Sequence, residues 1–170
     1  MLEIRQETKE DYEKIYNVIK TAFASAEHRD GNEQDLVNDL RKSENFITEL
    51  SLVATIEDEI VGHILFTKIK IGDSEELTLA PLAVLPEYQK QGIGGKLIIE
   101  GHKIAKKLGY HYCVVLGSEN YYPRFGYVPA IKYGIKAPFE VQSKNFMAIK
   151  LNSDEKKIEG IVEYAKEFKI

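Results

Sequence analysis

The sequence is poor in cysteine and has no long apolar stretch. Its 170 residues include one cysteine, Cys113, which excludes an internal disulfide and a zinc site built from several cysteines. No apolar run approaches the roughly 20 residues of a membrane-spanning helix. The N-terminus lacks a basic patch followed by an apolar stretch, which is the pattern of a signal peptide. We therefore expect a cytoplasmic chain with no membrane partner.

The patterns typical of nucleic-acid and metal binding are also missing. The chain carries 23 Lys and Arg against 27 Asp and Glu, a formal charge of −4, and its lysines are scattered. This distribution argues against a nucleic-acid partner. His28, His63, His102 and His111 are dispersed without a His-x-x-x-His pair, so we predict no metal site. We interpret His63 as a hydrogen-bonded structural residue and Cys113 as core filling.

The residues that are present suit one folded domain. At 44% apolar residues, a chain of this length buries roughly 70% of its extended surface without a metal or disulfide. Helical spacing of apolar residues predicts helices near 15–22, 36–40, 93–108 and 158–168. Strand-like patterns cover 2–5, 52–56, 60–71, 77–85, 112–116 and 146–151.

The lengths of the connections predict how these strands pair. Short turns join the three strands between 52 and 85, which favours antiparallel hairpins. The helix at 93–108 allows 112–116 to run parallel to 77–85. We predict an α/β (α+β) fold with a mixed, mostly antiparallel central sheet flanked by helices. Residues 1–151 form the domain, and 152–170 form a C-terminal helix, capped by Ser153, that packs on it.

The segment from Leu82 to Gly95 carries the clearest chemistry. An apolar strand leads through a polar loop into a glycine-rich helix start. The first amides of a helix have no internal partner, and the helix dipole adds positive charge there. Glycines at 92, 94 and 95 let a ligand approach the backbone, so a phosphate or pyrophosphate is the natural guest. The alternative is that these glycines only allow tight packing of helix on strand.

Two familiar phosphate-binding loops do not fit this segment. A Walker loop continues with Lys-Ser/Thr after its last glycine, whereas Gly95 is followed by Lys96 and Leu97. A dinucleotide-binding loop needs Gly-x-Gly-x-x-Gly, and only Gly92-Ile93-Gly94 matches, with Leu at position 97.

The segment resembles the acyl-CoA-binding motif of the GNAT superfamily of N-acetyltransferases. In that motif a strand is followed by Arg or Gln, two residues, Gly, one residue, and Gly or Ala; here it reads Gln89-Lys90-Gln91-Gly92-Ile93-Gly94. The segment from Tyr121 to Tyr127 is similar to the aromatic stretch that follows the fifth strand of the family. The resemblance extends from the N-terminus to about residue 130 and is closest to an uncharacterised bacterial branch of predicted acetyltransferases.

The resemblance implies a fold and a cofactor. The sheet would be splayed between its fourth and fifth strands, and Pro81 would help to open this gap. The co-substrate would be acetyl-CoA, with its pyrophosphate on the amides of residues 91–95 and its pantetheine arm along 82–84. The implied contact residues are Leu82, Ala83, Val84, Gln89, Lys90, Gln91, Gly92, Ile93, Gly94 and Gly95.

The resemblance also implies a reaction. A neutral primary amine attacks the thioester directly, and the tetrahedral intermediate collapses with loss of CoA. The amide of Leu82 would stabilise the oxyanion. Tyr122 would act as the acid that protonates the CoA thiolate, with Tyr121 as the competing candidate and wall packing as the alternative role for Tyr122. Many members carry an Asn that touches pantetheine where this chain has Val115.

The acceptor is not specified by the sequence. Glu27, Glu33 and Asp35 lie where the family builds its acceptor loop, so one of them would hold a cationic acceptor or relay its proton; a solvated helix start is the alternative. A small-molecule amine and a peptide N-terminus are both open, and a homodimer is the family-based expectation. Two other classes stay open: a non-catalytic acyl-CoA-binding regulatory module and a phosphate- or nucleotide-binding domain.

Overall fold

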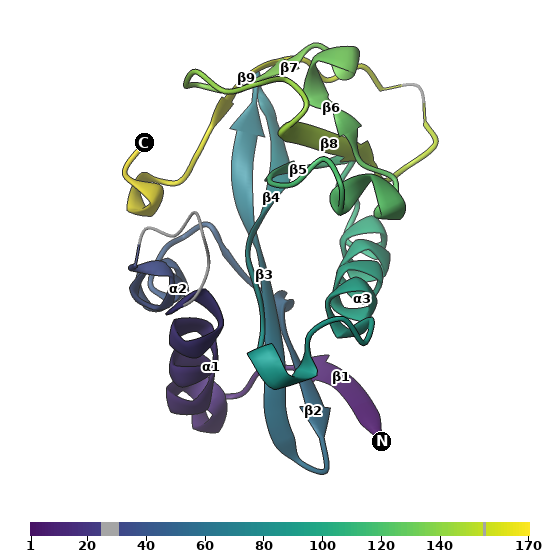
Figure 1. The fold of residues 1–170 in the computed structure, drawn as a ribbon. Helices are drawn as coiled ribbons and strands as arrows, with labels where there is room; N and C mark the ends of the chain where they lie inside the picture. Colours follow the sequence, from purple (N-terminus) through teal and green to yellow (C-terminus); the bar gives the residue numbers. More distant parts are fainter. Residues whose placement is uncertain (25–30, 155) are drawn as a thin grey trace.

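A computed structural model describes residues 1–24, 31–154 and 156–170. One large mixed sheet runs through it in the order β1-β2-β3-β4-β5-β8-β6; outside this order, β9 pairs with β3, and β7 pairs with β9 (Figure 1). The strands are β1 Leu2–Gln6, β2 Phe46–Ile56, β3 Glu59–Ile71, β4 Ser74–Val84, β5 Tyr112–Leu116, β6 Val128–Pro129, β7 Ile135–Lys136, β8 Phe146–Lys150 and β9 Gly160–Glu163. The helices are α1 Tyr12–Ala24, α2 Glu33–Arg41 and α3 Ile93–Lys107. Single 3-10 turns are η1 Lys9–Asp11, η2 Pro86–Tyr88, η3 Tyr122–Phe125, η4 Ala130–Tyr133 and η5 Lys166–Phe168.

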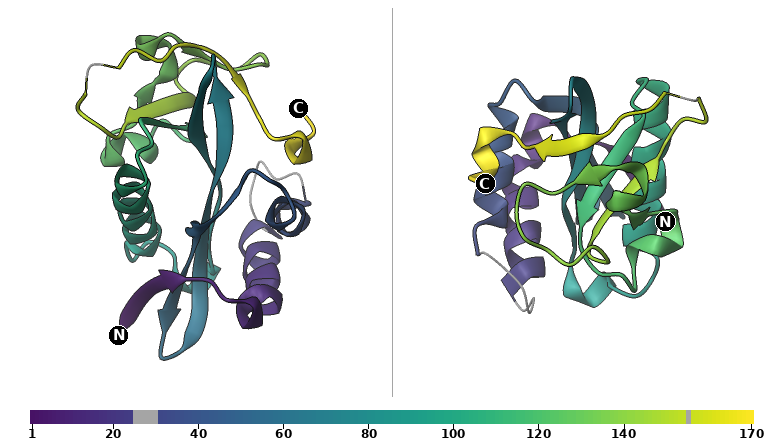
Figure 2. Two further views of the ribbon diagram at one scale, coloured as in Figure 1. Left: turned by 180° about the vertical axis from the view of Figure 1, so that it is seen from behind. Right: turned by 90° about the horizontal axis from the view of Figure 1, so that it is seen from above.

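Helices cover both faces of the sheet, as the hydrophobic patterns predict. α1 and α2 lie on one face and α3 on the other (Figures 1 and 2). The apolar stripe of α3, with Leu97 and Ile98, packs on one side of β2 to β4. Ile15 and Ile19 of α1 pack on the other side, so the central strands are buried on both faces. Within the described part of the chain, none of the helices is long and apolar enough to span a membrane.

The sheet opens between β4 and β5, which confirms the predicted splay. The two strands run parallel but pair only at Leu77 with Cys113 and at Thr78 with Val114. Beyond this point β4 continues along β3 alone, with a bulge that places Ala80 and Pro81 opposite a single residue of β3. The missing N–H of proline suits a position where the ladder is interrupted. The strand is therefore free of a β5 partner from residue 79 onward.

The predicted C-terminal helix is wrong. Residues 160–163 form β9, which pairs antiparallel with β3 and parallel with β7, and η5 follows. The buried positions Ile158, Val162 and Ala165 satisfy a helical spacing, but Gly160 adopts a φ of 133° that a helix does not allow. Pairing with strands distant in sequence thus overrides the local pattern. The segment still packs on the same domain, because Ala165 joins the core beneath α1 and α2.

A buried polar network ties α2 to the sheet. Arg41 at the end of α2 donates two hydrogen bonds of 2.9 Å to the carboxylate of Glu7. His63 of β3, fully buried, lies 3.4 Å from the same carboxylate and 2.9 Å from the hydroxyl of Ser51. The prediction that His63 is a hydrogen-bonded structural residue is confirmed. Buried charges need such partners, so the network holds α2 in one place against the sheet.

Gly101 lets α3 approach the sheet closely. A methyl group at this position would overlap the ring of Phe66, which is fully buried in β3. We expect Gly101→Ala to lower the free energy of unfolding by about 1–3 kcal/mol, because overpacking outweighs the better helix propensity of alanine. Urea unfolding measures the change, and Phe66→Leu in the same chain should restore part of it. A Gly101→Ala protein more stable than the parent would contradict this close packing.

Candidate active site

The N-terminus of α3 presents unpaired backbone amides. Gly92 is the N-cap residue with a φ of 83°, and Lys90 also adopts a left-handed conformation with a φ of 63°. Among the described residues, none of the amides of residues 91–95 donates a hydrogen bond to another protein atom. No protein atom lies within 4 Å of the place that a side chain on Gly92 would take. These amides are therefore available to an anion.

The loop before the helix is held by its own glutamines. The side-chain amide of Gln89 donates to the carbonyl of Val84 at 3.0 Å, and that of Gln91 donates to the carbonyl of Glu87 at 3.3 Å. Both side chains, predicted as cofactor contacts, bind the loop in this structure. They fix the path from β4 to α3 and so keep the amides of the helix start aligned.

A groove of about 730 Å³ runs from β4 across this helix start. Leu82, Val84 and the stretch from Gly92 to Gly95 line it, so the structure brings most of the predicted cofactor residues together. Ala83 does not line the groove; it is buried against α1 on the opposite face. Lys90, Lys96 and Arg124 are the charged residues of the lining, and all three are cationic. The groove therefore combines free amides with positive charge.

The two adjacent tyrosines lie in different surroundings. Tyr121 lines the groove, and a methyl group on Gly94 would stand 2.6 Å from its hydroxyl oxygen. Its ring packs against those of Tyr122 and Phe125, with centroids 5.1 and 5.3 Å away. Tyr121 therefore forms part of the wall of the groove, next to Gly94 at the start of α3.

Tyr122 faces a second cavity on the other side of Leu82. Its ring sits against Gly117, where an added methyl group would overlap it, and 5.7 Å from the ring of Tyr127. Burial, followed by the neighbouring Tyr121 and Cys113, raises the pKa of the Tyr122 phenol above its usual range. The phenol thus keeps its proton at neutral pH, and burial makes it a weaker acid than an exposed tyrosine.

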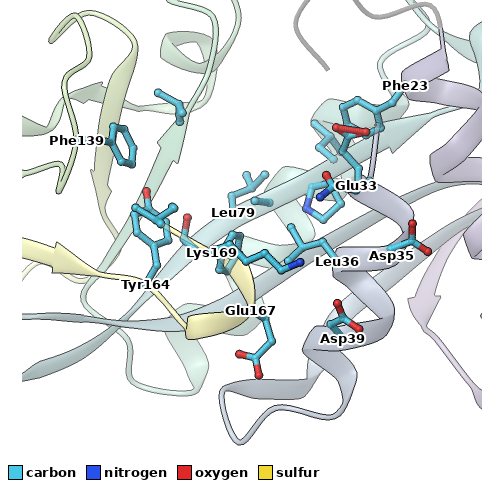
Figure 3. Close-up of a pocket in the computed structure, with 18 of the residues that line it drawn as sticks. Phe23, Glu33, Asp35, Leu36, Asp39, Leu79, Phe139, Tyr164, Glu167 and Lys169 are labelled. Atoms are coloured by element: carbon cyan, nitrogen blue, oxygen red, sulfur yellow. The ribbon is translucent and has the colours of Figure 1, made fainter. Parts of the chain in front are cut away.

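The second cavity has a volume of about 760 Å³. It lies between α2, the unpaired part of β4, the end of β5 and the C-terminal segment, and Figure 3 shows its residues. Ala80, Pro81, Leu82 and Tyr122 form the part of its wall nearest the splay. Leu82 is the one residue that lines both hollows among those described. The groove and the cavity therefore border the same residue of β4, in the stretch that has lost its β5 partner.

The acidic residues of α2 line this cavity. Glu33 and Asp35, predicted as acceptor-loop residues, are joined by Asp39. Asp35 accepts a hydrogen bond of 3.0 Å from the hydroxyl of Tyr16 of α1, and Glu33 accepts one of 3.3 Å from the amide of Gly31. The third predicted residue of this group, Glu27, lies outside the described residues, as does His28.

The sequence prediction missed several residues of the cavity. Phe139, Tyr164, Glu167 and Lys169 come 17 to 47 positions after Tyr122 and line the cavity together with α2. Burial raises the pKa of the Tyr164 phenol to about 12, so it too stays protonated. The pairing of β9 with β3 and β7 brings the segment with Tyr164, Glu167 and Lys169 to the cavity, and no local motif indicates that pairing.

The remaining reactive groups are structural. Cys113 is fully buried, and burial raises the pKa of its thiol to about 12, which suits core filling. The hydroxyl of Tyr127 donates to its sulfur at 3.3 Å and lies 2.8 Å from Nε2 of His102. Val115, at the place of the family's Asn, is buried in the core. The part of the chain that the structure describes holds no cluster of His, Cys, Asp and Glu able to bind a metal ion.

The sheet is opened between two parallel strands, with free helix amides on one side and a separate cavity on the other. This is the arrangement that the resemblance to the GNAT acetyltransferases implies. The family model described as acetyltransferase (GNAT) matches residues 4–127. The chain belongs to this family.

Several relatives support the assignment. The Escherichia coli K12 protein named uncharacterized N-acetyltransferase YjhQ is 41% identical over 118 residues, which are 66% of this chain and 65% of YjhQ. Uncharacterized N-acetyltransferase YhbS of the same strain is 32% identical over 140 residues, 80% of this chain and 83% of YhbS. The crystal structure of a GNAT acetyltransferase from Brucella melitensis in complex with acetyl-CoA superposes with a TM-score of 0.82 at 32% identity, covering 99% of this chain and 98% of that one.

Proposed function

We propose that this chain transfers the acetyl group of acetyl-CoA to a primary amine by direct attack. The observation that carries the proposal is the junction at Leu82 between the groove over the α3 amides and the acidic cavity. The similar Brucella melitensis protein was crystallised with acetyl-CoA, and a structure of YhbS with CoA superposes with a TM-score of 0.89 at 28% identity, covering 99% of this chain and 92% of that one.

The groove suits the anionic end of acetyl-CoA. Its pyrophosphate would lie on the amides of residues 91–95, where the helix dipole and Lys90 favour negative charge. The pantetheine arm would extend along the part of β4 from residue 82 to 84, toward the opening. The thioester would then reach the junction, where the Leu82 amide is our candidate for the oxyanion.

Tyr122 is our candidate for the general acid. It lines the cavity beside Pro81 and Leu82, whereas Tyr121 stands over the helix start. The Tyr122 phenol is protonated at neutral pH and can supply a proton to the departing CoA thiolate; because burial raises its pKa and weakens it as an acid, its place in the cavity and not its pKa supports this role. The incoming amine must first lose its own proton, and the cavity carboxylates are the groups that would take it up, directly or through water.

The finer assignments are proposals as well. The acceptor is a small-molecule amine or a peptide N-terminus, and the chain acts in the cytoplasm as one domain that includes residues 152–170. A homodimer is the proposed assembly, and sedimentation of the purified chain would measure it.

The proposal predicts a selective response to ligands. Acetyl-CoA and CoA should raise the melting temperature of the chain more than ATP at the same concentration, because ATP offers phosphates to the α3 amides but has no pantetheine arm to lie along β4. Release of free CoA with a panel of amines then tests turnover. Stabilisation by CoA without turnover of any amine would support a regulatory acyl-CoA-binding module instead. Stronger stabilisation by ATP would support a nucleotide-binding domain.

A further inference from the structure

The Tyr122 side chain is held in the cavity wall by packing. Among the described residues, none forms a hydrogen bond with its hydroxyl group. Its ring packs edge-on against those of Tyr121 and Tyr127, with centroids 5.1 and 5.7 Å away, and lies against Gly117. Its backbone belongs to η3, which a hydrogen bond of 3.3 Å from the Tyr122 amide to the carbonyl of Ser118 joins to the preceding loop. The place of the hydroxyl therefore depends on the walls around the ring.

Tyr127 is the better fixed of the two neighbouring rings. It is 1% exposed, and its hydroxyl donates a hydrogen bond of 3.3 Å to the sulfur of Cys113 and lies 2.8 Å from Nε2 of His102. Tyr121, by contrast, lines the open groove, and its hydroxyl has no hydrogen-bond partner among the described residues. A buried hydroxyl with two partners confines its ring to one position, so Tyr127 is the fixed wall against which Tyr122 packs.

The hydrogen bonds of Tyr127 run in one direction. Because its single hydroxyl proton points to the sulfur of Cys113, the Tyr127 oxygen is the acceptor toward His102, and Nε2 of His102 is the donor. Burial lowers the pKa of His102 to about 4 from 6.5, so the imidazole is neutral at pH 7 and carries its one proton on Nε2. The chain of hydrogen bonds therefore runs from His102 through Tyr127 to Cys113.

These partners connect Tyr127 to the two parts of the fold that frame the site. His102 belongs to α3, the helix whose first residues supply the free amides of the groove. Cys113 is one of the two β5 residues that pair with β4 before the sheet opens. Tyr127 is thus fixed relative to both the start of the groove and the root of the opening.

We infer that Tyr127, held by His102 and Cys113, is a positioning residue that keeps the hydroxyl of Tyr122 in one place in the cavity. This inference rests on the proposed function, in which that hydroxyl is the general acid. The acid and the groove for acetyl-CoA are then both aligned by α3. A displacement of about 1 Å at a reacting group can cost roughly 100-fold in rate, so a looser Tyr122 ring lowers turnover and leaves binding of acetyl-CoA intact.

A double-mutant cycle between Tyr127 and Tyr122 tests this role. Tyr127→Phe keeps the ring and removes both hydrogen bonds, so we expect kcat to fall about tenfold while KM for acetyl-CoA stays within about twofold of the parent. In a Tyr122→Phe chain, which has no hydroxyl to position, the same substitution should change kcat by less than about twofold. An equal loss in both backgrounds would show a general structural effect and would overturn the inference.

Variants of His102 test the anchor of Tyr127. His102→Leu removes the donor and should lower kcat about three- to tenfold, whereas His102→Gln offers an amide N–H near the place of Nε2 and should restore most of the loss. Tyr112→Phe is the matched control, because Tyr112 is a buried tyrosine of β5 that packs edge-on against Tyr133, and it should leave kcat unchanged. Melting temperatures ensure that only folded variants are compared. Equal losses in His102→Leu and His102→Gln would contradict the anchor.

A spectroscopic readout separates this inference from the proposed function. In protein labelled with fluorotyrosine, the fluorine NMR signal of Tyr122 is the one of the 10 tyrosine signals that Tyr122→Phe removes. This signal should shift or broaden in His102→Leu and return toward the parent in His102→Gln. A Tyr122 signal that His102→Leu leaves unmoved would overturn the inference, whether or not the chain turns over an amine. A displaced signal together with unchanged kcat in Tyr122→Phe would retain the positioning of Tyr122 and reject it as the acid.

Discussion

Replacing Tyr122 by Phe should lower kcat by about 100-fold or more and leave the affinity for acetyl-CoA nearly unchanged. A positioned general acid contributes roughly 100- to 10,000-fold, and the substitution removes only the hydroxyl. The ring of Tyr122 packs against Gly117 and Tyr127, and phenylalanine keeps this packing. Steady-state release of CoA measures kcat, and titration calorimetry measures the cofactor affinity.

Tyr121→Phe is the matched control for this prediction. It removes a hydroxyl from the neighbouring residue, which lines the groove rather than the cavity. We expect a change in the affinity for acetyl-CoA and at most a few-fold change in kcat. If Tyr121→Phe abolished turnover and Tyr122→Phe did not, the acid would be Tyr121. Unchanged turnover in both variants would remove the tyrosines from the proton-transfer step.

Replacing Arg41 by Met should destabilise the chain by about 3–5 kcal/mol. The two side chains of the Arg41–Glu7 pair are only 7% and 3% exposed, and removal of one partner leaves a buried charge without compensation. Methionine keeps the aliphatic stem of Arg41 and removes its charge. Chemical unfolding of the parent, of Arg41→Met, of Glu7→Gln and of the double variant gives the coupling between the two residues. A double variant that loses the sum of both single losses would show that they act independently.

The same pair predicts an acid dependence of stability. Burial alone would raise the pKa of Glu7, but hydrogen bonds from His63, Arg41 and Ser51 outweigh it and lower the pKa to about 2 from 4.5. Ionised Glu7 therefore stabilises the fold above pH 4.5, and this contribution, up to about 3 kcal/mol, is lost as the pH falls through 2. Asp11, paired with Arg5, loses its contribution in the same range because its pKa is also about 2. Arg41→Met should flatten this dependence by the share of Glu7, and an unchanged slope would contradict the assignment.

Local pattern is sufficient to predict the groove proposed for acetyl-CoA. The glycines at 92, 94 and 95, the strand before them and the apolar stripe of α3 lie within one continuous segment, and short connections determine how its strands pair. The parallel pairing of β4 with β5 followed from the helix between them, and both the pairing and the splay are confirmed. The roles of the individual cofactor residues and of Tyr122 stay predictions.

The cavity proposed for the acceptor depends on contacts between distant segments. Residues 126–145 contain Pro129 and Gly134 and show little periodicity, so β6, η4 and β7 were not predicted. Ile158, Val162 and Ala165 are spaced as on one face of a helix, and of these only Val162 lies in β9, so the local pattern predicts a helix. Phe139, Tyr164 and Glu167 follow these elements in the chain and line the cavity. Their position depends on the pairing of β9 with the C-terminal end of β3. A single sequence carries little signal for such placement.

That both hollows are lined by Leu82 has a consequence for how substrates bind and products leave. Among the described residues, Leu82 alone lines both hollows. Acetyl-CoA and the amine would therefore enter from opposite sides of β4, and neither would block the entry of the other. Each product, CoA or the acetylated amine, would then dissociate through its own hollow while the other product stayed bound. A bisubstrate inhibitor, in which CoA is joined covalently to the amine, would place its linker beside Leu82. The size of the Leu82 side chain would therefore limit how wide that linker can be.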